Sequence, residues 1–238
     1  MVTVVGRRRK LLDELVCQMG GGVAVDADLR DPDQCQTLVE RAVAGCGGFE
    51  ALVFAASAST LAMTADAGVG VWRTVLETNV IAPALVTRSL LPYLAPGAFM
   101  GYLSSEMVGD PYHGLAHYSS SKAALEELIR ALRVEHPAYR FCCIRVGATM
   151  DTEFARDFSP ELASELHQHW VERAKIPASL MVSAQVGQAV AATVAIALAT
   201  PGIDLQDLTV RPPGGPMLGP LPDVADQITE LHKLADTQ

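Results

Sequence analysis

The 238-residue sequence lacks any run of eighteen apolar residues, and its first basic residues follow an apolar start instead of preceding it. The first absence argues against a membrane-spanning helix, and the second argues against a secretory signal peptide. We therefore expect a cytoplasmic protein that has no membrane partner.

Positive charge is scarce as well. Eighteen Lys and Arg residues stand against 27 Asp and Glu residues, which gives a formal net charge of −9. Nucleic acids and anionic membrane surfaces are bound by clustered Lys and Arg side chains. The charge balance therefore argues against both classes of partner.

The cysteines do not form a recognisable pattern. They are five in number, are scattered, and lack the paired spacing of a metal site or of a disulfide framework: Cys17, Cys35, Cys46, Cys142 and Cys143. We expect them to be small core residues in a reducing compartment. The histidines show no metal constellation either, so no metal site is predicted.

Short apolar strands alternate with amphipathic helical stretches along the chain. Half of the residues are hydrophobic and 19% are charged, a composition that can bury a large core. The alternation predicts an α/β sheet protein, which we expect to be a single domain over residues 1–238.

One segment carries most of the chemical information. Tyr118 and Lys122 are four residues apart in a predicted helix, so they share a face on which the ammonium lies near the phenol. A nearby cation lowers the pKa of a phenol, which suits proton transfer. Such a pair occurs by chance in many helices, but here an apolar strand at 99–103 delivers Ser104 and Ser105 just upstream.

A strand followed by Ser-Ser, a step of thirteen residues from Ser105 to Tyr118, and then Y-S-S-S-K-A-A-L resembles the catalytic segment of the short-chain dehydrogenase/reductase family. The resemblance implies a doubly wound parallel-sheet Rossmann-type fold, a nicotinamide cofactor and a small carbonyl or alcohol substrate. It also implies a homodimer or homotetramer. Tyr118 would exchange the proton, Lys122 would lower its pKa and hold the cofactor ribose, and Ser105 would polarise the substrate oxygen.

Asn79 lies inside a predicted helix over residues 69–94, where asparagine is locally disfavoured. The resemblance implies that Asn79 bends this helix through a water and completes the catalytic tetrad by positioning a proton-relay water. The alternative is a buried structural asparagine whose amide is fully hydrogen-bonded.

The start of the chain corresponds to the second strand of the family, whose end receives the adenosine ribose. An acidic residue would accept from the ribose 2′-hydroxyl, whereas Gly6, Arg7 and Arg8 leave room and charge for a 2′-phosphate. This favours NADP(H) over NAD(H), although these arginines also fit a solvated helix start. Asp28 and Leu29 match the position that contacts adenine, and an ordinary turn aspartate is the alternative.

Three further segments are compared with the family. Residues 54–57 read Phe-Ala-Ala-Ser where relatives have Asn-Asn-Ala-Gly, so Ala56 is retained beside the cofactor while the bracing amides are absent. Val146 and Gly147 stand in place of Pro-Gly near the nicotinamide carboxamide, which Thr149 or Thr152 would contact. Residues of about 150–183 correspond to the variable substrate lid, whose apolar side chains indicate either an apolar substrate wall or simple core.

The family's first strand, its T-G-x-x-x-G-x-G turn and its first helix find no counterpart. Neither Gly20–Gly22 nor the glycines of a tail at about 212–238, itself expected to be an interface element or a frayed terminus, replace that turn. A sheet without its middle strand would leave neighbouring backbone groups unpaired. We therefore expect either a true start upstream of Met1 in an NADP(H)-dependent oxidoreductase, or a truncated non-catalytic subunit that pairs with a complete relative.

Overall fold

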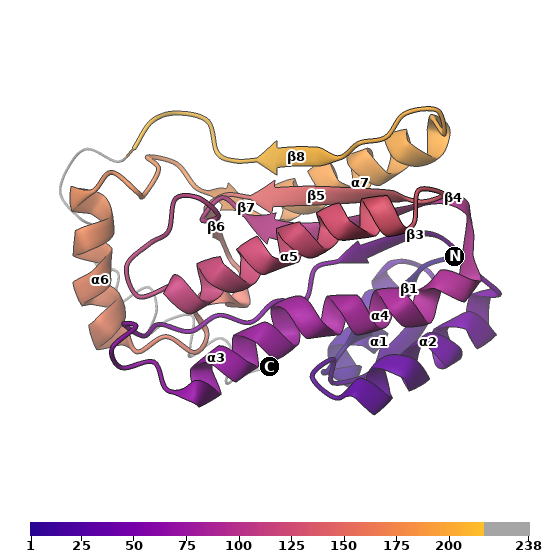
Figure 1. Cartoon of the computed structure of the whole chain (residues 1–238), viewed down its shortest axis with the longest axis horizontal. Coiled ribbons are helices and arrows are strands. Elements are labelled where there is room, and N and C mark those ends of the chain that lie inside the picture. Colours follow the sequence, from indigo (N-terminus) through magenta and orange to yellow (C-terminus); the bar gives the residue numbers. More distant parts are fainter. Residues whose placement is uncertain (217–238) are drawn as a thin grey trace.

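A computed structural model describes residues 1–216 of the chain. The main elements alternate in order as β1 (Thr3–Gly6), α1 (Arg9–Gln18), β2 (Val23–Asp26), α2 (Pro32–Cys46), β3 (Phe49–Phe54), α3 (Val69–Leu76), α4 (Ala82–Leu90), β4 (Leu94–Ser105), α5 (Ala116–Glu135), β5 (Arg140–Val146), β6 (Thr149–Met150), α6 (Pro160–Glu172), β7 (Met181–Val182), α7 (Ser183–Ala199) and β8 (Asp207–Val210). The predicted α/β Rossmann-type fold is confirmed: parallel strands are flanked by helices on both faces (Figure 1).

The strands form a divided sheet. The larger part has the order β3-β4-β5-β8, while β1 pairs with β2 in a separate two-stranded sheet, and both are parallel throughout. Within residues 1–216, no backbone hydrogen bonds pair β1 with β3. Apolar side chains of these two strands are partly open to solvent: Val5 is 38% exposed and Val53 is 37% exposed. The expected interruption therefore lies between these two strands.

One hydrophobic core nevertheless joins both sheets. Side chains of β2 and α2 belong to the same buried cluster as those of α4, β4 and α5, with Val25, Val39, Val86, Met100 and Ile129 as examples. A second cluster packs β4 and β5 against α7 on the opposite face. The two-stranded sheet is thus attached through helices where backbone pairing is absent.

The predicted helix over 69–94 is present in four pieces. A π-helical turn at Glu77–Ile81 separates α3 from α4, and a 3₁₀ turn at Leu91–Tyr93 ends the helix before β4 begins at Leu94. A π turn carries one extra residue, and such turns are frequent at functional sites. Asn79 lies in this turn and is fully buried.

Two smaller expectations can be compared with the structure. Cys35, Cys142 and Cys143 are buried as free thiols, but Cys17 is exposed on α1, so the prediction that all the cysteines are core residues is wrong there. Most of the predicted tail at 212–238 lies outside the described residues. No helix within residues 1–216 has the length and apolar character needed to cross a bilayer.

Candidate active site

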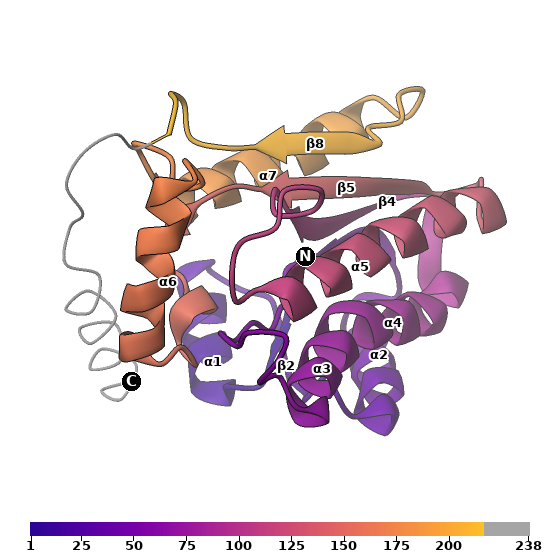
Figure 2. The same ribbon diagram turned by 60° about the vertical axis from the view of Figure 1, so that its left-hand side comes forward.

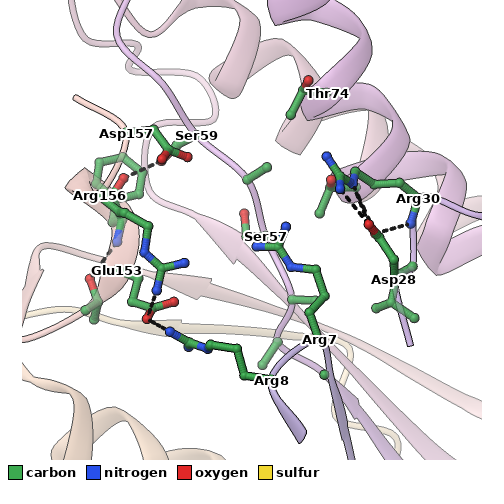
Figure 3. Close-up of a pocket in the computed structure, with 18 of the residues that line it drawn as sticks. Arg7, Arg8, Asp28, Arg30, Ser57, Ser59, Thr74, Glu153, Arg156 and Asp157 are labelled. Atoms are coloured by element: carbon green, nitrogen blue, oxygen red, sulfur yellow. Dashed lines mark hydrogen bonds and ion pairs between the residues drawn. The ribbon is translucent and has the colours of Figure 1, made fainter. Parts of the chain in front are cut away.

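A cavity of about 520 Å³ opens where β1, β2 and β3 end (Figure 3). This is the edge at which parallel α/β sheets bind ligands. The irregular segment 152–157, which precedes α6, and Tyr118 form its other walls. Figure 2 shows α6 standing beyond the carboxyl ends of the strands, where the lid was expected.

Eight of the predicted site residues line this cavity: Gly6, Arg7, Arg8, Asp28, Leu29, Ala56, Tyr118 and Thr152. Six do not: Asn79, Ser105, Lys122, Val146, Gly147 and Thr149. The cavity therefore brings the residues assigned to the adenosine end together with the Tyr118 phenol. The other catalytic candidates lie behind the cavity wall, and residues 146–149 form a separate turn after β5.

Tyr118 sits in the first turn of α5 and is only 6% exposed. Phe154 from the lid packs edge-on against its ring, with the ring centres 5.2 Å apart. Burial raises the pKa of Tyr118 to about 12, although hydrogen bonds between the phenol and the Ser105 and Ser57 hydroxyls oppose part of that shift. The phenol is thus protonated at neutral pH.

Lys122 lies one turn further along α5. Its Nζ is 5.8 Å from the centre of the Tyr118 ring and donates to the carbonyl oxygen of Leu103 at 2.8 Å. Burial lowers the pKa of Lys122 to about 8. Burial of the phenol decides the direction of the pKa shift of Tyr118 here, and the lowering of that pKa by the Lys122 ammonium stays a prediction.

Asn79 holds the loop after β3 against α5. Its Nδ2 donates to the carbonyl oxygen of Ala58 and to Ser121 Oγ, both at 2.9 Å, while its Oδ1 accepts from the Ala58 N–H at 2.8 Å and from Ser57 Oγ at 3.2 Å. These bonds occupy both amide protons and both lone-pair directions. The geometry matches the alternative reading, a buried structural asparagine.

Ser105 ends β4 and is buried beside Tyr118. Its Oγ accepts from the Met107 N–H at 3.2 Å, which leaves its proton for the phenol. Ser57, in the loop after β3, also hydrogen-bonds to the phenol while donating its own proton to Asn79 Oδ1, and it was missed by the sequence analysis. The signal available was its place directly after an apolar strand, where α/β proteins put their chemistry.

Arginines also line the cavity. Arg8 follows β1 and Arg156 lies in the lid, and both form ion pairs with the carboxylate of Glu153 (Figure 3). Arg7 lines the same cavity. The pKa of Arg156 is lowered by burial and then by the charges of Arg8 and Arg7, so the three guanidinium groups lie close enough to repel one another.

Asp28 is engaged by its own neighbour. The Arg30 Nε donates to both of its carboxylate oxygens, at 3.0 and 3.1 Å, and the Arg30 N–H also donates to Oδ1 at 3.1 Å. These bonds lower the pKa of Asp28 to about 2. The bond from the Arg30 N–H to the Asp28 carboxylate closes a turn after β2. This geometry matches the alternative interpretation of Asp28 as an ordinary turn aspartate.

The turn assigned to the nicotinamide end lies against Glu106. Glu106 Oε1 accepts from the Ala148 N–H at 3.2 Å, and a Cβ atom on Gly147 would come within 2.7 Å of Glu106 Oε2. Thr149 instead donates to the Gly147 carbonyl oxygen at 2.9 Å. Glycine at 147 is therefore explained by packing against Glu106.

The residues fit the two ends of a nicotinamide dinucleotide. Guanidinium groups suit a phosphate, and Leu29 and the Tyr118 phenol line the same cavity. The cavity lining within residues 1–216 has no glycine-rich turn for the pyrophosphate. Gly20, Gly21 and Gly22 all have positive φ and simply join α1 to β2.

Comparisons with known proteins agree with this geometry. The family model described as short chain dehydrogenase matches residues 1–169. A human protein, dehydrogenase/reductase SDR family member 2, mitochondrial, is 30% identical over 166 residues, which cover 66% of this chain and 59% of the relative. A short chain dehydrogenase of Pseudocercospora fijiensis is 31% identical over 134 residues, covering 54% of this chain and 43% of the relative. The chain thus spans about half the length of the curated relatives it matches.

Two solved structures have the same fold. One is the alcohol dehydrogenase of the archaeon Thermococcus sibiricus complexed with 5-hydroxy-NADP, with a TM-score of 0.72 and 16% identity over 88% of this chain and 84% of that one. The other is a short-chain dehydrogenase/reductase of Brucella melitensis, with a TM-score of 0.71 and 20% identity over 87% and 83% of the two chains. Because the family model covers well over half of the residues, the chain belongs to the short-chain dehydrogenase/reductase family.

Proposed function

We propose that the chain is an NADP(H)-dependent oxidoreductase that interconverts a carbonyl and a secondary alcohol. The observation that carries the proposal is a cavity that is lined both by arginines at the end of β1 and by a serine-bonded phenol. A nicotinamide cofactor, when bound, supplies or accepts the hydride. The chain's own residues then have to bind it and move one proton.

Tyr118 is the proposed proton donor. A phenol with a pKa of about 12 is fully protonated at neutral pH, so it is ready to give its proton to a carbonyl oxygen that gains negative charge. The Ser105 hydroxyl then donates a hydrogen bond to the phenolate, and Lys122, 5.8 Å from the ring centre, favours that anion. This arrangement suits reduction of the carbonyl.

Preference for NADP(H) rests on the charge at the end of β1. Arg7 and Arg8 follow Gly6 there, and no acidic residue stands at those positions to accept from a ribose 2′-hydroxyl. The likeness to a dehydrogenase whose structure holds an NADP analogue supports the same choice.

The substrate we propose is an apolar carbonyl or alcohol. Tyr118 belongs to a cluster with Leu61, Leu115, Phe158 and Leu166, against which further apolar lid residues pack. The predicted homodimer or homotetramer and the cytoplasmic location stay predictions, and the human relative described above is mitochondrial by name.

The test combines binding with turnover. We expect the purified chain to bind NADPH and to reduce an apolar ketone, and Tyr118→Phe to bind NADPH normally while losing turnover by at least about a thousandfold. Tyr93→Phe, at a 39% exposed tyrosine outside the cavity, serves as the matched control. Turnover by the Tyr118→Phe variant at the wild-type rate would contradict the assignment.

Two observations favour a second candidate, a non-catalytic subunit that pairs with a complete relative. The sheet is divided between β1 and β3, and Phe154 covers the phenol. A chain that binds no NADPH and reduces no ketone, yet forms a stable complex with an intact relative, would establish this candidate in place of the first.

A further inference from the structure

The lid places a carboxylate among arginines that belong to different parts of the chain. The 3₁₀ turn Glu153–Ala155 begins after Thr152, and Glu153 is paired there with Arg8 of the β1–α1 connection and with Arg156 of the lid itself (Figure 3). Residues 8 and 153 are 145 positions apart, so this contact joins the adenosine end of the cavity to the lid.

The pair leaves positive charge in excess. Arg7, Arg8 and Arg156 line the cavity together with the carboxylates of Asp28, Glu153 and Asp157. The fourth arginine of the lining, Arg30, is already held by Asp28. Glu153 is the carboxylate that both Arg8 and Arg156 contact, so it occupies the place where an incoming anion would meet two guanidinium groups at once.

The same short turn reaches the phenol. The carbonyl oxygen of Phe154 accepts from Ser59 Oγ at 2.5 Å, and its ring packs edge-on against Tyr118. Release of Glu153 from its arginines would therefore loosen the residue that covers Tyr118. Glu153, which holds the arginines, and Phe154, which covers the phenol, are adjacent in the chain, so a change at one is passed directly to the other.

We propose that Glu153 is an internal competitor for a phosphate monoester at Arg7, Arg8 and Arg156, and that binding of the phosphate displaces Glu153 and transfers Arg156 from the carboxylate to the ligand. The inference rests on the proposed function, because the ligand that brings such a group is NADP(H). Arg156 becomes a third phosphate-binding arginine, contributed by the lid. Glu153 sets how strongly the site discriminates in favour of the phosphorylated cofactor.

The experiment measures dissociation constants of 2′,5′-ADP, 5′-AMP, NADPH and NADH by calorimetry. Glu153→Gln removes the competing charge at nearly constant shape, so it should bind 2′,5′-ADP and NADPH about threefold to tenfold more tightly while 5′-AMP and NADH change little. Arg156→Ala should weaken the two phosphorylated ligands by a similar factor. Glu161→Gln and Arg173→Ala, both on or next to α6 and outside the cavity, should match wild type.

The outcomes separate the two proposals. Wild-type binding of NADPH together with unchanged affinities in the folded Glu153→Gln variant would overturn the competitor role and leave the proposed function standing. Failure of every variant to bind NADPH or 2′,5′-ADP would overturn both. An equal gain for 5′-AMP and for 2′,5′-ADP would also overturn the inference, because the effect would then not depend on the 2′-phosphate.

Discussion

Asn79 is the only asparagine in the chain, and it is fully buried with each of its amide atoms engaged. Replacing it with alanine leaves the Ala58 N–H and carbonyl oxygen without partners and removes the bond to Ser121. We expect Asn79→Ala to lower the free energy of unfolding by about 2 to 4 kcal/mol, measured by chemical denaturation.

A single asparagine also allows a direct observation of its side chain. Selective ¹⁵N-asparagine labelling should give one side-chain amide pair, and its protons should exchange slowly because both are donated inside the protein. Rapid exchange, or an Asn79→Ala variant of unchanged stability and lost activity, would instead support the proton-relay role.

Lys122 gives a prediction in pH. Its pKa is about 8 in the folded chain against an ordinary value of 10.5, so between these values the unfolded chain holds a proton that the folded chain does not. The cost of burying the charge is therefore constant below pH 8 and is relieved as the pH rises toward 10.5. Relative to Lys122→Met, wild type should gain about 3 kcal/mol across this window.

Denaturation of both proteins at several pH values measures the difference. Lys10→Met, at a side chain 79% exposed on α1, controls for general effects of losing a lysine. A difference between wild type and Lys122→Met that stays flat from pH 8 to pH 10.5 would contradict the buried, shifted ammonium.

At the scale of elements, the loop between β4 and α5 is fitted to the lid helix. Gly114 has φ +73°, and a Cβ atom there would clash with Cδ1 of Leu166, which is buried on α6. Gly109 in the same loop has φ +86°, but a Cβ atom there would meet open space. Alanine at 109 would therefore suffer backbone strain alone, whereas alanine at 114 would suffer the same strain and a steric clash.

We expect Gly109→Ala to lower the free energy of unfolding by about 1 kcal/mol and Gly114→Ala to lower it by about 2 to 4 kcal/mol. Combining Gly114→Ala with Leu166→Ala should cost less than the sum of the two single changes, since the second removes the atom that clashes. Equal costs for the two glycine variants in thermal unfolding would mean that the loop and α6 are not tightly packed.

The elements themselves were predictable where a local pattern decided them. The apolar run of β4, the serines at its end and the helix carrying Tyr118 follow from periodicity and spacing. The π turn at Asn79 did not, because one added residue barely changes a helical pattern. Glu153 and Arg156 lie in an irregular segment without a period, so only tertiary structure shows that they meet Arg8.

The electrostatics of the site were less accessible for the same reason. Sequence spacing placed Lys122 near Tyr118 correctly, yet it could not show that Phe154 would cover the phenol. Burial then dominates the pKa of Tyr118. Spacing along one helix reports neighbours on that helix and nothing of what another segment lays over them.

At the scale of the whole molecule, the divided sheet predicts uneven stability. β1 and β2 contribute four residues each, whereas β4 has twelve and lies between two partners. A two-stranded sheet is only marginally stable without packing. In native-state hydrogen exchange, the amides of Val4 and Val25 should be protected on the order of 100-fold less than those of Tyr102 and Cys143.

The proposed cofactor should reduce this difference in amide protection. Residues that follow strands of both sheets line its cavity, and a ligand that binds only the folded form raises protection by mass action. Added NADPH should therefore slow exchange in β1 and β2 most. Equal protection of all four amides without ligand would mean that the two sheets open as one unit.

The open edges of β1 and β3 also bear on how the protein behaves in concentrated solution. A strand edge with exposed apolar side chains, such as those around Val5 and Val53, is a template onto which a strand of another molecule can pair. A net charge of −9 keeps copies apart by mutual repulsion, and this repulsion is screened by salt. The chain should thus remain dispersed at low ionic strength and form β-rich aggregates as salt is added, so its shelf life depends on the buffer as much as on its fold.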